Sequence, residues 1–380
     1  MVKNWITLSI RRFSRNKANS FINILGLSLG MIVFLVIFIY VKHEFSYDNF
    51  HAHSDRVFRL IKENPPGENH YKGINKQAVL PAPLADVIKE QITGVESVTR
   101  MMRQRTLVVE TDGKTFYEEA YHGADADLFD ILTFEALYGN LNLALDKPRT
   151  VAISEATAIK YFGSTNVVGK VIEITGTKNL GSYTVDLVFG SFPTNSSFKF
   201  NIILRFEDLV KTMQPTDLEN WNNYNYNFLV KTSQNGDPFD IGYQIRNFFI
   251  RKYEGTDNEE NRNTNYLLEP LADIYLGSDV NFTNTPKNDI NRLYMLVTIA
   301  IFVLIVAGIN YVNLTTARSI KRAKEVGIRK VSGAYQSNLV LQFLTDALTI
   351  SAVSMIISLL VIWIIFPKPR ICKKISSIIY

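Results

Sequence analysis

The chain has 380 residues, of which 47% are hydrophobic and 20% are charged, and its formal net charge at pH 7 is +5. The charge is segregated, because residues 43–290 hold 24 basic and 34 acidic side chains whereas the rest of the chain holds 17 basic and 2 acidic ones. This acidic middle excludes the uniformly basic surface that would favour nucleic acid, and the single cysteine, Cys372, excludes an internal disulfide.

Residues 1–20 are predicted to form a cytoplasmic amphipathic helix that lies on the membrane surface. At helical spacing, Ile6, Ile10 and Phe13 share one side, and arginines share the other. Such a basic amphipathic helix suits an anionic lipid surface. A plain basic leader is the alternative that the pattern leaves open.

The uncharged run that follows predicts a membrane helix over residues 21–42. Roughly 20 residues at about 1.5 Å per residue cross a hydrocarbon core of about 30 Å. The bulky and charged residues after the run do not form a signal-peptide cleavage site, so the run is interpreted as an anchor. Gly26 and Gly30 lie about one turn apart in it, and we expect them to let another helix approach closely.

Residues 43–290 are predicted to form a large domain of mixed α and β structure outside the cytoplasm. A serine before a helical pattern that a glycine ends indicates a helix over residues 154–162. Further helices are expected over residues 83–92 and 238–253. Strands are expected over residues 98–103, 107–110, 116–121, 170–175, 183–192, 198–206 and 226–230, with a hairpin turn at Asp112-Gly113.

Two more apolar runs predict membrane helices over residues 291–313 and 339–366, with a cytoplasmic segment, residues 314–338, between them. Basic residues are concentrated before the first run and between the later two. Because basic loops remain in the cytoplasm, both basic segments are placed inside and residues 43–290 are placed in the periplasm. The bacterial inner (cytoplasmic) membrane is the expected location.

Motifs of known chemistry fail on spacing or on context. Gly163 to Lys170 is similar to a phosphate-binding loop, but its spacing is too long and Val171 stands where Ser or Thr would bind magnesium, so it is interpreted as a turn. His51 and His53 have no further clustered ligand, so their segment is interpreted as solvated rather than as a metal site. We predict no catalytic residue, no metal, no cofactor and no nucleic-acid partner.

The cytoplasmic segment is short and basic, has helical character and is interrupted by two glycines. It is too short to be a domain, but it suits the groove of a partner protein. Ile328 and Val331 would then be apolar anchors, and the basic residues would form the rim. A loop that serves only membrane topology is the alternative, and the pattern alone does not separate the two.

One run in this segment and several in the middle domain carry a family resemblance. Residues 322–334 read Arg-Ala-Lys-Glu-Val-Gly-Ile-Arg-Lys-Val-Ser-Gly-Ala, and residues 342–346 read Gln-Phe-Leu-Thr-Asp. Both resemble cytoplasmic elements of the ABC transporter permeases that include MacB and FtsX, with Asp346 where that family has Glu. Runs that resemble the MacB-like periplasmic core domain in its Bacteroidetes form are residues 47–51, 56–60, 127–139, 152–163, 168–170 and 192–196.

The resemblance implies a permease without an ATPase of its own, which pairs with a separate ABC ATPase subunit and with a second permease copy or half. It implies that closure of the ATPases moves the periplasmic domain through the membrane helices. Export, lipoprotein or peptide handling, and envelope signalling with a periplasmic or outer-membrane partner all fit this scheme. The residues expected to couple to the ATPase are Arg318, Arg322, Lys324, Glu325, Gly327, Ile328, Arg329, Lys330 and Gly333.

The expected fold class is an α-helical membrane protein with three spans here, a fourth expected from the family, and a large α+β extracytoplasmic domain. Residues 367–380 form an atypical basic tail, which would lie outside, so we expect the chain to be truncated or frame-shifted. A membrane-anchored sensor that signals inward through a partner is the alternative function. An anchored envelope enzyme is disfavoured because no catalytic constellation is found.

Overall fold

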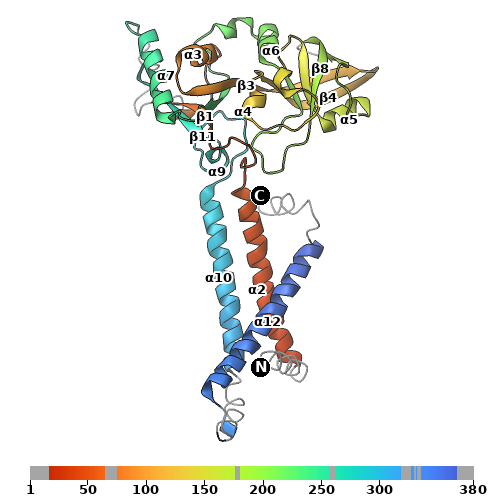
Figure 1. Cartoon of the computed structure of the whole chain (residues 1–380), viewed down its shortest axis with the longest axis vertical. Helices are drawn as coiled ribbons and strands as arrows, with labels where there is room; N and C mark the ends of the chain where they lie inside the picture. The colour runs from red at the N-terminus through yellow and green to blue at the C-terminus, as the bar shows by residue number, and fades with distance from the viewer. Residues whose placement is uncertain are drawn as a thin grey trace. The chain divides into compact units, whose positions relative to one another are not determined.

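The computed structural model describes residues 17–64, 75–175, 180–256, 262–317, 327, 328, 331 and 335–365. The chain divides into two compact units (Figure 1). We call Ser46–Asn288 the sheet unit, and Met1–Phe45 together with Asp289–Tyr380 the helix unit. The division follows composition, because the acidic middle of the chain forms the sheet unit and the long apolar runs form the helix unit.

The helix unit contains three long helices, α2 (Lys17–Glu44), α10 (Ile290–Thr316) and α12 (Gln336–Ile365). Each holds an apolar stretch of 23 to 27 residues that is long enough to cross a membrane. Helix α10 begins at an Asp289 cap, whose side chain accepts a hydrogen bond from the backbone N–H of Asn291 at 2.8 Å. Helix α2 contacts both α10 and α12 (Figure 1). The three predicted spans are confirmed.

The sheet unit is built from short strands and helices. Its strands are β1 (Val57–Glu63), β2 (Lys76–Gln77), β3 (Val95–Thr111), β4 (Lys114–Ala124), β5 (Ala136–Gly139), β6 (Thr150–Ser154), β7 (Val171–Thr175), β8 (Gly181–Phe189), β9 (Ile202–Arg205), β10 (Asn227–Thr232) and β11 (Asn265–Pro270). Its helices are α3 (Leu84–Gln91), α4 (Leu128–Ile131), α5 (Glu155–Phe162), α6 (Phe206–Met213), α7 (Pro238–Lys252) and α9 (Asp273–Leu276), with 3₁₀ turns η2 (Leu141–Leu143) and η3 (Pro215–Leu218).

Within the described residues, these strands form one mixed sheet in the order β11-β1-β10-β3-β4-β9-β6-β8-β5, with β2 beside β1 and β7 beside both β3 and β8. Most neighbours are antiparallel, but β4 pairs with β9 and β6 with β8 in parallel. Parallel pairs need crossover connections, and α5 supplies one between β6 and the strands that follow. The predicted α+β class is therefore confirmed.

Both faces of the sheet are covered by apolar side chains. Successive residues of a strand point to opposite faces, so on β6 Val151 and Ile153 join one core cluster and Ala152 joins the other. The first cluster is closed by α3, α5, α6 and α7, and the second by α4, α9 and the aromatic segment that ends at Phe200. The sheet unit thus has a two-sided core, which agrees with its lack of disulfides.

Local capping and turn signals predicted two elements well. Ser154 caps α5 by accepting from the backbone N–H of Thr157 at 3.2 Å, and Gly163 ends the helix in the left-handed conformation at φ 68°. Asp112 and Gly113 both have positive φ in the tight turn between β3 and β4. The same glycine cap makes the 163–170 segment a turn, as interpreted.

The two predicted strands over residues 98–103 and 107–110 are one strand, β3. Thr106 has a positive φ of 62°, but pairing with β4 continues on both sides of it. Met102 before this point and Leu107 after it face the same core cluster, although their spacing would put them on opposite faces of a regular strand. The backbone turns the strand over at Thr106, which ends the apolar alternation without ending the strand.

The predicted strand over residues 198–206 is wrong for most of its length. Only Ile202–Arg205 is a strand, and Phe206 begins helix α6. Phe198 and Phe200 alternate because their rings stack on one another at 6.4 Å between centroids and are buried in the second core cluster. The period of two arises from ring burial in an irregular segment rather than from strand pairing.

Candidate functional site

The contact between α2 and α10 depends on a glycine. A Cβ atom at Gly30 would lie 2.5 Å from the Cβ of Ala307 and 3.7 Å from the carbonyl oxygen of Val303. At Gly26, one turn earlier, a Cβ atom would lie 3.3 Å from the side-chain Nδ2 of Asn310. Small residues let helix backbones approach closely in lipid. Gly30 is therefore required for the close approach of α2 and α10, whereas the space beside Gly26 is less restricted.

The contact between α2 and α12 is made by serines. Ser28 donates to the carbonyl oxygen of Ser354 at 3.3 Å, and Ser354 donates back to that of Ile24 at 3.3 Å. The hydroxyl of Ser358 is shared between the carbonyl oxygen of Ser28 at 3.0 Å and that of Ser354 in its own helix at 2.7 Å. All three serines are buried. Hydroxyls that bond across a helix pair stabilise it in a membrane, typically by about 1 kcal/mol each. The motif Gly-x-Ser-x-Gly around Ser28 is thus part of a helix contact.

Most of the residues expected to couple to an ATPase lie outside the described part of the chain. These are Arg318, Arg322, Lys324, Glu325, Arg329, Lys330 and Gly333. Gly327 and Ile328 are described as helical. Ile328 is 62% exposed and Val331 is 90% exposed. A Cβ atom at Gly327 would meet no other described atom within 4 Å. The roles of these residues stay predictions.

The segment that follows α2 is locked into the sheet unit. Asp48, with a φ of 58°, accepts the backbone N–H of Ser197 at 2.8 Å, and the Asn195 side chain donates to the carbonyl oxygen of Ser46 at 2.9 Å. His51 accepts the backbone N–H of Thr133 through Nδ1 at 3.0 Å. Asp48 and His51 are almost completely buried. The interpretation of this segment as solvated is therefore wrong, because its polar groups bond backbone that is distant in sequence.

Helix α9 holds both ends of the sheet unit. The ring of Tyr275 stacks on that of Tyr47 at 3.4 Å between centroids, with the planes 2° apart. The backbone N–H of Asn288 donates to the carbonyl oxygen of the same Tyr275 at 2.8 Å. Tyr47 follows α2 and Asn288 precedes α10 in the chain. The two connections to the membrane helices are therefore joined at one residue, which no sequence pattern indicated.

Acidification is expected to destabilise the sheet unit through His51. Burial lowers the pKa of His51 from 6.5 to about 4. The contribution of the neutral His51 ring to the free energy of unfolding is therefore complete above pH 6.5 and is lost as the pH falls towards 4. The full loss attributable to this group, reached below pH 4, is roughly 3 kcal/mol, of which about 2 kcal/mol falls between pH 7.5 and pH 5. Burial raises the pKa of Asp48, which acts in the opposite direction and offsets part of the loss. Urea unfolding at pH 7.5 and pH 5 measures the change.

The matched variant for this prediction is His51→Asn, whose side-chain oxygen can still accept the Thr133 N–H but does not titrate. It should lose less stability than wild type between pH 7.5 and pH 5. The remaining pH dependence belongs partly to His122. Burial, and after it the charge of Arg103, lower the pKa of this histidine to about 4. An equal loss in wild type and His51→Asn would contradict the assignment to His51.

Across the described residues, no group of three or more His, Cys, Asp or Glu side chains is arranged to hold a metal ion. The His51 ring has its Nδ1 engaged by Thr133, and its Nε2 lies 3.9 Å from Asp48 Oδ1, too far for a hydrogen bond. The pair of buried side chains is therefore structural in this geometry. What the described residues bring together is a set of helix contacts and anchors.

Comparison with known proteins identifies both units. Residues 20–248 match the family model described as MacB-like periplasmic core domain, and residues 297–369 match that described as FtsX-like permease C-terminal. The chain is 37% identical over 115 residues to the macrolide export ATP-binding/permease protein MacB of an Azoarcus species, covering 30% of this chain and 17% of that protein. It is 31% identical over 109 residues to the pyoverdine export ATP-binding/permease protein PvdT of Pseudomonas savastanoi, covering 29% of this chain and 14% of that protein.

Solved structures of low identity are similar to part of this chain. A domain of a putative permease protein from Porphyromonas gingivalis is 22% identical, with a TM-score of 0.47 over 65% of this chain and 99% of that one. The periplasmic region of MacB from Actinobacillus actinomycetemcomitans is 15% identical, with a TM-score of 0.39 over 57% of this chain and 89% of that one. The chain spans less than a fifth of the length of the curated relatives that it matches. The family models, however, cover most of it, and the chain belongs to the MacB/FtsX family of ABC transporter permeases, as a membrane protein with a MacB-like extracytoplasmic domain.

Proposed function

We propose that this chain is the permease subunit of an ABC transporter of the MacB/FtsX type in the bacterial inner membrane. In this role it couples ATP hydrolysis by a separate ATPase subunit to movement of its periplasmic domain. The observation that carries the proposal is the central place of α2 in the helix unit. Helix α2 contacts α10 and α12, the two helices between which the basic segment 317–335 lies in the chain.

The contacts of α2 suit the transmission of force. A displacement of the basic segment acts on the end of α10 and on the start of α12, and both helices are packed closely on α2. Packed helices move as rigid bodies, because interiors are nearly incompressible. Helix α2 continues directly into the segment 46–56, which hydrogen bonds hold in the sheet unit. Its displacement would therefore reach the core of that unit rather than be absorbed by a loose linker.

The shared anchor at Tyr275 supports the same scheme. Tyr47 stacks on its ring and Asn288 bonds its backbone, so the two chain connections to the membrane helices cannot move far apart without breaking one of these contacts. A relative movement of α2 and α10 would thus be converted into a strain on α9. We propose that the basic segment binds the ATPase, that two permease copies or halves form the complex, and that the cargo or signalling target engages the periplasmic domain.

The test is co-purification of the full chain with the ATPase that is encoded beside it, with Gly327→Trp and Arg329→Glu as variants. Wild type should retain the ATPase, and each variant should reduce its retention by roughly tenfold or more, which is typical of a lost interface hot spot. The matched control Arg251→Glu makes the same charge change on the exposed surface of α7 and should retain the ATPase fully. Absence of the ATPase from wild type, or full retention by both variants, would refute the proposal.

Coupling is measured on the same complex by hydrogen–deuterium exchange of residues 46–56. ATP should change the exchange of this segment in the wild-type complex, because the segment follows α2 in the chain. It should change nothing in the chain without ATPase or in the Gly327→Trp variant. An ATP effect that is absent from the intact complex would mean that the ATPase binds without moving the periplasmic domain.

A further inference from the structure

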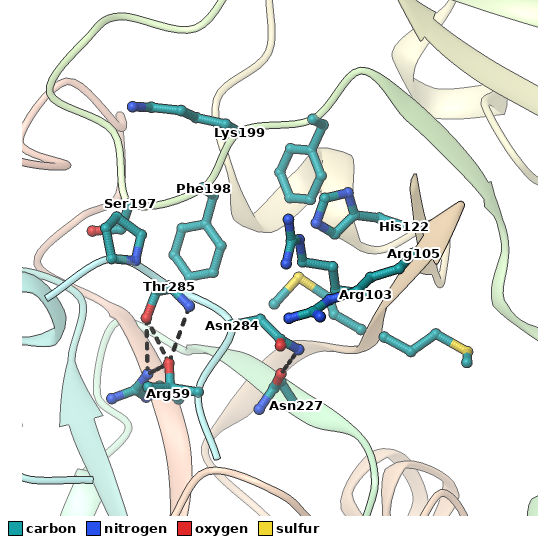
Figure 2. Close-up of a pocket in the computed structure, with 15 residues that line it drawn as sticks. Arg59, Arg103, Arg105, His122, Ser197, Phe198, Lys199, Asn227, Asn284 and Thr285 are labelled. Atoms are coloured by element: carbon teal, nitrogen blue, oxygen red, sulfur yellow. Dashed lines mark hydrogen bonds between the residues drawn. The ribbon is translucent and has the colours of Figure 1, made fainter. Parts of the chain in front are cut away.

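A cavity of about 400 Å³ opens on the sheet unit beside strands β3 and β4. Side chains of β1, β3, β4 and β10 line it on one side, and residues 197–200 and 283–286 line it on the other. Figure 2 shows Arg103 and Arg105 extending from their strand into the space between these segments. Elements that are far apart in the sequence thus enclose one space, all of it within the sheet unit.

The cavity is positively charged although the unit that contains it is acidic. Arg59, Arg103, Arg105 and Lys199 line it, and the described lining residues include no Asp or Glu. Arg59 is neutralised, because its guanidinium donates to Glu269 Oε2 at 2.5 and 2.9 Å. Arg103, Arg105 and Lys199 make no ion pair or hydrogen bond with the described part of the chain. Arg103 and Arg105 therefore bring two cations without a described ion pair to one space, whereas the Lys199 side chain extends away from them (Figure 2) and its charge acts on Asp48.

The cations are presented on a firm scaffold. Arg103 and Arg105 are two residues apart on β3 and pair across the ladder with His122 and Ala120, so both belong to the same regular part of the strand. On the opposite side, Asn284 donates to the Asn227 side chain at 3.1 Å. The ladder therefore fixes the backbone from which both arginine side chains extend.

One wall of the cavity is aromatic. The rings of His122 and Phe200 meet edge to face at 4.9 Å, and Phe198 stacks beside Phe200. His122 Nδ1 is buried and has no hydrogen-bond partner among the described residues. Burial, and after it the charge of Arg103, lower the pKa of His122 to about 4, so the ring is neutral at pH 7. The wall therefore offers apolar surface and one unused polar atom beside the arginines.

We propose that this cavity binds the oxyanion group, phosphate or carboxylate, of a small amphipathic molecule. The two guanidinium groups of Arg103 and Arg105 offer forked donors to such a group. The aromatic wall takes the apolar body of the molecule. A volume of about 400 Å³ falls in the range of small-molecule pockets. This site is distinct from the helix contacts.

The test is calorimetric titration of the full chain in nanodiscs of phosphatidylcholine, with phenyl phosphate as the probe. Phenyl phosphate combines a dianion with a planar apolar body, whereas phenol and inorganic phosphate each carry one half of that chemistry. Saturable binding of phenyl phosphate that is tighter than that of both partial probes is expected. Phenol that binds as tightly as phenyl phosphate, or no saturable binding of phenyl phosphate below about 10 mM, would overturn the proposal.

The diagnostic variant is Arg103→Gln/Arg105→Gln, and its matched control is Arg251→Gln on α7. Both sites are exposed and without described ion pairs, so neither change should affect folding, which circular dichroism verifies. The double variant should weaken phenyl phosphate binding by roughly tenfold or more, the effect of losing charge-assisted hydrogen bonds. The control should bind as wild type does. Equal affinities of wild type and the double variant would overturn the proposal.

A competition experiment separates the two sources of such a ligand. Dihexanoyl phosphatidylglycerol, added as monomers, should displace phenyl phosphate if the cavity accepts the headgroup of an anionic lipid. Dihexanoyl phosphatidylcholine is the matched neutral competitor. Displacement by the anionic lipid alone supports a lipid ligand, and displacement by neither supports a soluble one. Equal displacement by both would show that charge is not what the cavity recognises, which contradicts the proposal.

Discussion

Replacing Gly30 by leucine is expected to separate α2 from α10 and thereby to uncouple the helix unit. Even the first atom of the new side chain would lie 2.5 Å from the Cβ of Ala307, where no real contact is tolerated. No rotamer change can move the Cβ of Ala307, so the helix backbones themselves must shift. Overpacking of this kind costs about 1–3 kcal/mol, and about 1.4 kcal/mol changes an association equilibrium tenfold.

Cross-linking in native membranes measures this effect. A chain with Gly26→Cys and Asn310→Cys, and with Cys372→Ser to remove the native thiol, carries one pair of cysteines across the α2–α10 contact. The pair should cross-link efficiently with Gly at position 30 and poorly with Leu. The matched control is Gly308→Leu on α10, where a Cβ atom would meet nothing within 4 Å. Equal cross-linking in the Gly30→Leu and Gly308→Leu chains would show that the α2–α10 contact does not depend on Gly30.

Removing the carboxylate of Asp125 is expected to cause the largest loss of stability in the sheet unit. The buried Arg100 donates to Asp125 through Nε and Nη2, each at 2.9 Å, and its guanidinium lies 4.4 Å from the ring of Phe206. Asp125→Ala leaves this guanidinium buried without its counter-charge, which costs about 3–5 kcal/mol. Urea unfolding of the sheet unit, produced as residues 46–288, measures the change in the free energy of unfolding.

Two further variants distinguish the effect of leaving Arg100 without its counter-charge from the effect of removing an ordinary ion pair. Arg100→Met/Asp125→Ala removes both charges and should be more stable than Asp125→Ala alone, because no unpaired charge stays buried. Asp127→Ala removes the partner of Lys89 in a pair that lies 2.6 Å apart but is half exposed. It should cost less than about 1 kcal/mol. An Asp125→Ala loss no larger than that of Asp127→Ala would contradict the assignment of Arg100 as a buried, dependent cation.

The parts of the fold that could be predicted are those whose causes are local in sequence. The three spans follow from uninterrupted apolar length, and α5 follows from Ser154 and Gly163 at its two ends. The hairpin between β3 and β4 follows from two adjacent residues that tolerate positive φ. In contrast, the strand pairing could not be predicted, because β1 lies between β10 and β11, which come more than 150 residues later.

The candidate sites divide in the same way. The spacing of Gly26 and Gly30 alone predicts that they lie in a contact between helices. The spacing does not indicate which helix they contact. The buried role of Asp48 depends on Ser197, which is 149 residues away, and no local pattern announces it. Arg103 and Arg105 form a visible pair in the sequence, but Lys199 and the segment that holds Asn284 come to the same cavity only through the sheet.

The serine contacts between α2 and α12 recur at a regular spacing along the two helices. Ser354 bonds the carbonyl oxygen of Ile24 and Ser358 bonds that of Ser28, so donors and acceptors both repeat at one helical turn. If α12 slides along α2 by about 5.4 Å, one turn, Ser354 comes to the position at which Ser358 now bonds Ser28. Such a shift would therefore replace one serine–carbonyl contact between the helices by another of the same kind.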